Sequence, residues 1–121
     1  MRAAGESLAQ ALGIFRTTGN RNAEAWALNF YAAAIAAAGE LPRAHALYEQ
    51  ALTMNRELNK PDDEAVAREG LGESLLSLGE SGPGTAQLRQ ALEIYERLGM
   101  TPDTDRVRNR LADLTTAGTG A

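Results

Sequence analysis

The chain has 121 residues, of which 44% are hydrophobic and 5% aromatic, and its formal net charge at pH 7 is -4. One domain of this size buries about two-thirds of its unfolded surface, and the acid excess argues against direct contact with nucleic acid, whose binding proteins carry basic patches. The chain has no cysteine, which excludes disulfides and thiolate metal sites and favours a reducing cytoplasm, and it has no apolar run long enough to span a membrane.

Glycines and prolines divide the chain into predicted helices. Within each segment, apolar residues recur with the three- and four-residue spacing of an amphipathic helix, as Leu8, Ala11, Leu12 and Phe15 do near the start. The short connections between segments favour antiparallel neighbours. The six predicted helices cover about 4–17, 22–38, 42–58, 61–78, 85–98 and 101–114. The fifth is expected to begin late, near Thr85, because Gly82-Pro83-Gly84 breaks its first turn.

The sequence repeats with a period of 40 residues. Ala11-Leu12 recurs as Ala51-Leu52 and as Ala91-Leu92, and Gly39 and Gly79 have the same spacing. A fixed period of this size is typical of a solenoid, in which each unit buries its apolar face by stacking on its neighbours. We therefore predict an all-α protein, a right-handed α-solenoid of antiparallel helix hairpins.

The expected domain spans residues 1–115. It consists of a half repeat at 4–18, repeats at 22–58 and 62–98, and a half repeat at 102–115, followed by a disordered tail at 116–121. Because the pattern starts and stops in mid-repeat, we expect either a segment of a longer array or ends that associate.

Specific residues of this pattern resemble the tetratricopeptide repeat. The first match carries Leu28, Tyr31, Ala32, Ile35, Gly39, Leu41, Ala44, Tyr48 and Ala51-Leu52, and the second carries Leu71-Gly72, Leu75, Gly79, Leu88 and Ala91-Leu92. The family places small residues where its helices cross. The chain departs from the family in its period of 40 rather than about 34, in Gly84 where alanine is usual, and in Trp26, two positions before the family's tryptophan. HEAT and armadillo arrays, which also have periods near 40, remain the alternative.

The resemblance implies a non-catalytic module that binds a protein or peptide segment in a concave groove lined by the first helix of each pair. Arrays of this period are similar to those in bacterial signalling proteins, including the C-terminal regions of transcriptional regulators. Carried over to this chain, the groove residues are Trp26, Asn29, Phe30, Ala33, Glu69, Glu73, Arg106, Asn109 and Arg110. Val66, Leu76 and Asp113 accompany them.

Each candidate has a structural alternative. Trp26 and Phe30 are anchors for a partner or core residues packed on the first helix. Arg106 and Arg110 resemble a pair that clamps a peptide carboxylate, or they form ion pairs with Asp103, Asp113 or the acids of the preceding helix. The alanines at 32–34 and 36–38 allow close helix packing or form a patch for self-association.

The sequence contains no catalytic constellation, so we expect no enzyme, no cofactor and no metal site. His45, the only histidine, has no cysteine or second histidine to join it. The leading hypothesis is protein or peptide binding by a cytoplasmic bacterial protein, with neither a membrane nor a nucleic acid as partner. The alternative is self-association into a dimer or a superhelical assembly, through the repeat ends or the alanine-rich face.

Overall fold

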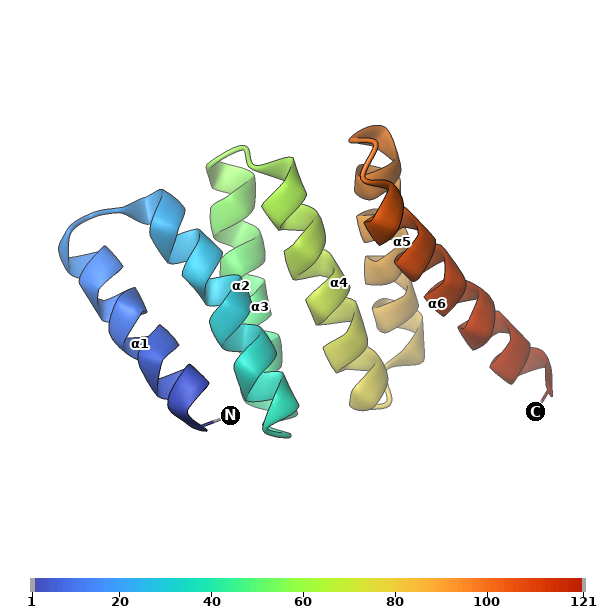
Figure 1. Cartoon of the computed structure of the whole chain (residues 1–121). Coiled ribbons are helices and arrows are strands. Elements are labelled where there is room, and N and C mark those ends of the chain that lie inside the picture. Colours follow the sequence, from blue (N-terminus) through green and yellow to red (C-terminus); the bar gives the residue numbers. More distant parts are fainter. Residues whose placement is uncertain (1, 121) are drawn as a thin grey trace.

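The computed structural model describes residues 2–120, with side chains described for 5–117. Every regular element in this part of the chain is a helix, so the predicted all-α solenoid is confirmed (Figure 1). The helices are α1 (Arg2–Thr17), α2 (Arg21–Ala37), α3 (Leu41–Glu57), α4 (Pro61–Ser77), α5 (Ser81–Arg97) and α6 (Thr101–Gly120).

The structural unit is 20 residues long, half of the sequence period. Each of α2 to α5 has 17 residues, and three residues join it to the next helix. A residue with positive φ stands at the same place in every turn, namely Gly19, Gly39, Asn59, Gly79 and Gly99. The period of 40 thus reflects longer helices rather than longer loops.

Every turn ends its helix with the same hydrogen bonds. Between α2 and α3, the Gly39 N–H donates to the Ala36 carbonyl at 2.9 Å, and the Glu40 N–H donates to the Ile35 carbonyl at 3.2 Å. This is the Schellman arrangement, which satisfies carbonyls at the helix end and requires a left-handed residue. In the turn between α1 and α2, the side chain of Asn20 accepts a hydrogen bond from the Ala23 N–H and so caps the start of α2.

The fifth helix begins at Ser81, so the late start expected near Thr85 is wrong. Pro83 lies in the first turn, where a missing N–H leaves no helical hydrogen bond unmade. Gly84 is buried, and a Cβ built there would lie 2.9 Å from the Gly72 carbonyl oxygen of α4. The glycine therefore permits a close crossing of α4 and α5 rather than interrupting a helix.

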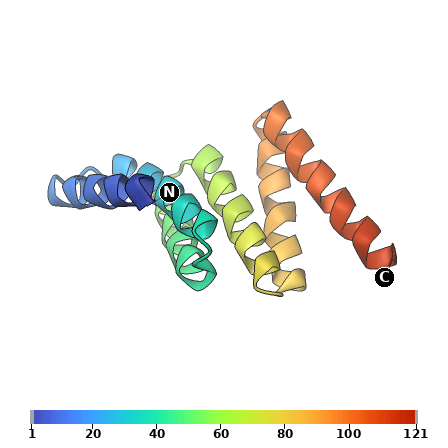
Figure 2. The same ribbon diagram turned by 60° about the horizontal axis from the view of Figure 1, so that its bottom comes forward.

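The six helices form a twisted two-layer array. Figure 1 shows α2, α4 and α6 in front of α3 and α5, and neighbouring helices pack along the whole chain. The axes change direction steadily, so that α1 and α6 point in clearly different directions (Figure 2). The first helix of each hairpin thus contributes to one continuous surface.

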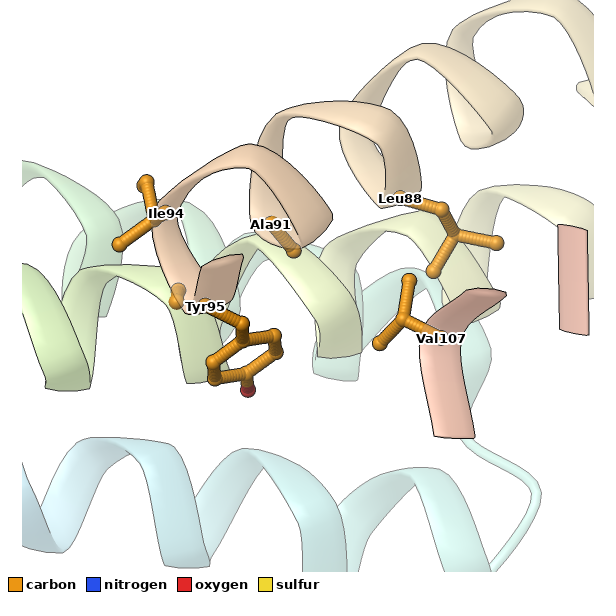
Figure 3. Packing of buried hydrophobic residues seen from close by; sticks show 6 residues of the cluster. Leu88, Ala91, Ile94, Tyr95 and Val107 are labelled. Carbon is orange, nitrogen blue, oxygen red and sulfur yellow. The ribbon is translucent and has the colours of Figure 1, made fainter. Parts of the chain in front are cut away.

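The core passes through the array as a chain of apolar clusters. At the C-terminal end, Leu88, Ala91 and Tyr95 of α5 pack with Ala65 of α4 and Val107 of α6, and the Leu88 and Val107 side chains face each other (Figure 3). Each helix completes its burial only through its neighbours, as a solenoid requires.

The last helix continues past residue 115, where we expected a tail to begin. Its backbone is helical to Gly120, and the hydroxyls of Thr115 and Thr116 donate to the carbonyls of Leu111 and Ala112. Ala121 and the side chains from 118 onward, which belong to the expected tail, lie outside the described residues.

Candidate functional site: the α2–α4–α6 face

The candidate groove residues come from α2, α4 and α6, and their chemistry changes along the array. The surface they form is here called the α2–α4–α6 face. Because the period is 40, each position on α2 has a counterpart on α4 and α6. The matching positions hold Trp26, Val66 and Arg106, then Phe30, Gly70 and Arg110, and then Ala33, Glu73 and Asp113. The face thus carries aromatic side chains at α2, small and acidic ones at α4, and charged ones of both signs at α6.

Trp26 and Phe30 form an exposed aromatic ledge on α2. Their relative exposures are 47% and 52%, and their ring centroids lie 4.7 Å apart with planes inclined at 49°. Neither residue is among the buried core residues, so the alternative that they pack against α1 as core is wrong. Two rings that contact each other and remain open to solvent can receive a partner's apolar side chain at little cost in conformational freedom.

Asn29 does not belong to the open surface. It is 5% exposed, and its Nδ2 donates to the Asp63 carbonyl at 3.1 Å, which ties α2 to the first turn of α4. Its Oδ1 has no hydrogen-bond partner among the described residues. The carry-over from the family placed Asn29 in the groove, but the close approach of α2 and α4 buries it.

Glu69 is the centre of a network that joins α4, α5 and α6. Its carboxylate accepts from Nε and Nη2 of Arg106 at 2.8 and 2.7 Å and from the Tyr95 hydroxyl at 2.9 Å. Arg106 also donates to Asp103 at 2.8 Å. A guanidinium fork that meets two carboxylates is already satisfied, so Arg106 is not free to clamp a peptide terminus.

Glu73 and Arg110 form a second ion pair one turn further along both helices. Nε and Nη2 of Arg110 donate to the carboxylate at 2.9–3.2 Å, and each side chain is 41% exposed. Both arginines form ion pairs, as their structural alternative expected. The acids are Asp103 of α6 and Glu69 and Glu73 of α4, rather than acids of α5, the helix directly before α6. Ala33 and Asn109, also predicted for the groove, are exposed.

The network shifts the ionisation of its members in a consistent direction. Burial, followed by the charge of Glu69, raises the pKa of Tyr95 well above its ordinary value of 10.0. The hydrogen bond to Glu69 raises the pKa of Arg106, and that to Glu73 raises the pKa of Arg110. The guanidinium groups therefore remain charged and the phenol remains neutral at physiological pH.

A cavity of about 430 Å³ lies where α2, α3 and α4 meet, and both glutamates of the ion pairs line it. It is here called the α2–α4 cavity, and it is lined by Ala36, Ala37, Leu41, Tyr48, Val66, Glu69, Gly70, Glu73, Ser74 and Ser77. Gly70 leaves room for the Tyr48 ring, because a Cβ at this position would lie 2.2 Å from two ring carbons. Gly70 stands where α2 has Phe30 and α6 has Arg110, and the space beside it is occupied by the Tyr48 ring, which forms part of the cavity wall.

This cavity was not predicted from the sequence. Tyr48 and Leu41 matched the repeat pattern and were read as structural residues, and Ser74 and Ser77 carried no signal of their own. One signal was available: a glycine at a repeat position that elsewhere holds a large side chain predicts a close approach to the backbone at that point. Gly70, aligned with Phe30 and Arg110 by the period of 40, is such a glycine.

No protein-family model matches the chain, and no curated protein is similar enough to indicate kinship. None of the described helices combines the length and the apolar character needed to cross a membrane. Across residues 5–117, whose side chains are described, no group of three histidine, aspartate or glutamate side chains is placed to hold a metal ion.

Proposed function

We propose that the chain is a non-catalytic protein-binding module of the tetratricopeptide type, in which a peptide segment or partner helix docks on the α2–α4–α6 face. The repeat motifs support the family, and the helical array supports the docking mode, because such arrays present long continuous surfaces. The proposed setting is a bacterial regulatory or signalling protein in the cytoplasm, which the absence of cysteine suits.

The observation that carries the proposal is the aromatic ledge. The chain has one tryptophan and two phenylalanines, and it leaves Trp26 and Phe30 about half exposed side by side. Leaving large rings in water forfeits the stabilisation that burial would give, about 1.5–3 kcal/mol for a phenylalanine. Tryptophan is also the residue most enriched among binding hot spots. A docking role accounts for both facts.

The test begins with a random peptide library displayed on phage and selected against the immobilised chain. Enriched peptides are synthesised with a fluorophore, and their affinities are measured by anisotropy. Trp26→Ala and Phe30→Ala should each weaken binding by at least about tenfold, the loss expected of an interface anchor. Both variants should keep the helical circular dichroism of the wild type, because the rings do not belong to the core.

The matched control is Ile14→Ala, which removes an exposed apolar side chain (61%) on α1, outside the α2–α4–α6 face. It should leave the affinity unchanged. Binding that survives both ring substitutions would move the site elsewhere. A loss of helicity on either substitution would return the rings to a structural role.

Self-association is the second candidate, and the structure favours one end for it. Ile14 is 61% exposed, whereas Ile94 at the matching position of α5 is 7% exposed. On α6, Asp105 is exposed where α2 and α4 bury Ala25 and Ala65 completely. Stacking copies through α6 would take the exposed pair of Asp105 and Arg108, whose charged atoms lie 4.0 Å apart, out of water, and desolvation costs several kcal/mol per ion.

Copies that associate would therefore do so through α1 rather than through α6. Light scattering after size exclusion over a range of concentrations measures this directly. Ile14→Lys should return any larger species to the monomer mass of 12.9 kDa. A concentration-independent monomer would remove this candidate.

A further inference from the structure

The α2–α4 cavity has a polar lining made entirely of oxygen. The side chains that contribute polar atoms to it are those of Tyr48, Glu69, Glu73, Ser74 and Ser77. No side chain that lines it carries nitrogen, and two of the polar groups are carboxylates, which only accept hydrogen bonds. An occupant that donates hydrogen bonds therefore fits this lining better than one that accepts them.

The charge around the cavity has the sign that attracts a cation. On the same side of α4 and α6 stand four carboxylates and two guanidinium groups, which leaves an excess of two negative charges: Glu69, Glu73, Asp103 and Asp113 against Arg106 and Arg110. The nearest α2 side chains, Ala36 and Ala37, are uncharged. An approaching basic group therefore meets a net attraction, and an acidic group meets a net repulsion.

The walls of the cavity suit the stem of a long basic side chain. Leu41 and Val66 provide aliphatic surface, and the Tyr48 ring lies against Gly70. Lysine and arginine bury their methylene stems on such surfaces while the charged head remains at the polar end. At that end, Glu73 is 41% exposed and presents its carboxylate beside the exposed Ser77.

We propose that the α2–α4 cavity receives a lysine or arginine side chain of the docked segment, while an apolar side chain of the same segment packs on the aromatic ledge. The inference rests on the proposed function and specifies that the partner segment carries one apolar and one basic residue at a fixed spacing. Phe30 and Ala37 are seven helical residues apart, or about 10 Å. An extended segment covers this distance in about three residues, so the motif is an apolar residue and a basic residue three positions apart.

Charge substitutions at Ser77 test whether the cavity prefers a basic occupant, because Ser77 lines the cavity, is exposed and is the last residue of α4. Ser77→Lys adds a positive charge beside the cavity and Ser77→Glu adds a negative one. For a library-selected peptide with the motif, Ser77→Lys should weaken binding about fivefold, and Ser77→Glu should strengthen it by a similar factor. Both effects should become smaller at high salt. The control Thr53→Lys adds the same charge on the exposed surface of α3 and should leave the affinity for the peptide unchanged.

The peptide provides the complementary control. Replacing its basic residue by citrulline, which keeps the shape of arginine without its charge, should weaken binding to the wild type and abolish the response to both Ser77 substitutions. Thermal melts of the variants confirm that they remain folded. A response of the citrulline peptide equal to that of the charged peptide would overturn the inference.

The outcomes separate this inference from the function on which it rests. Selected peptides that depend on Trp26 and Phe30 but carry acidic or neutral residues at the second position would overturn the basic occupant and retain the docking face. If neither ring substitution changes the affinity for the peptides, the proposal that the α2–α4–α6 face is the docking site is itself overturned. Enrichment of the motif together with opposite effects of the two Ser77 variants supports both.

Discussion

At the residue scale, the close crossing of α4 and α5 depends on two glycines, Gly72 and Gly84. A Cβ on Gly84 would lie 2.9 Å from both the Gly72 carbonyl oxygen and the Leu76 Cγ, and the carbonyl belongs to a helix that cannot give way cheaply. We expect Gly84→Ala to lower the free energy of unfolding by about 1–3 kcal/mol through overpacking, even though alanine is the better helix former. Urea denaturation measures the change.

Gly82→Ala is the matched control for this prediction. It lies in the same first turn of α5, and a Cβ there meets nothing within 4 Å. It should be neutral or stabilising by up to about 1 kcal/mol, because alanine restricts the unfolded chain. Equal effects of the two substitutions would show that helix propensity, and not the α4–α5 crossing, governs the position.

The spacing of single residues predicted the turns well and the polar contacts poorly. The Gly39 and Gly79 positions and the repeated Ala-Leu pairs placed the helices, because a left-handed turn residue and a helical stripe are local properties. The burial of Asn29 was not predicted, because it depends on how closely α4 approaches α2. Likewise, Glu69 meets Tyr95 across helices, a pairing between residues 26 positions apart that no local pattern contains.

At the element scale, two ion pairs join α6 to α4, and they differ in solvent exposure and in the number of hydrogen bonds. Glu69 has 21% of its side chain exposed and accepts three hydrogen bonds, whereas Glu73 and Arg110 are each 41% exposed. We expect Glu69→Gln to lower the stability of α6 by about 1–2 kcal/mol, because it weakens the hydrogen bonds of a partly buried carboxylate. Glu73→Gln should cost less than about 1 kcal/mol, as exposed pairs do.

Native-state hydrogen exchange resolves this prediction helix by helix. Amides of α6 should exchange faster in Glu69→Gln than in Glu73→Gln, while those of α2 and α3 should keep their protection, because solenoid stability is summed over neighbours. Uniform acceleration in all helices would instead show a single cooperative unit. An equal response of α6 to both substitutions would contradict the ranking by burial.

The element scale also shows where sequence reasoning misplaced a boundary. Gly82-Pro83-Gly84 has the composition of a loop, and the first turn of α5 nevertheless forms there. A proline within the first helical turn costs no hydrogen bond, and a glycine at a helix crossing is selected by packing rather than by turn geometry. Composition alone does not distinguish a glycine that forms a turn from a glycine that permits a helix crossing. The position of Gly84 opposite Gly72 does distinguish them, but it is known only when the pairing of the helices is known.

At the scale of the whole molecule, two tyrosines couple stability to alkaline pH. Burial, and then the charge of Glu69, raises the pKa of both Tyr48 and Tyr95 above the ordinary value of 10.0. The folded chain therefore holds these protons more tightly than the unfolded chain does. The stabilisation is complete below pH 10 and is lost as the pH rises above it, since the unfolded phenols ionise first and draw the equilibrium toward unfolding.

We expect the free energy of unfolding to fall between about pH 10 and pH 11 with a slope of up to about 1.4 kcal/mol per pH unit for each tyrosine. Urea denaturation from about pH 8 to pH 11 measures this slope. Tyr48→Phe should make it shallower, because phenylalanine fills the same space without a proton to lose. If Tyr48→Phe left the slope unchanged, the phenol beside the α2–α4 cavity would be ionising freely in the folded state, and the cavity wall would be open to water at that point.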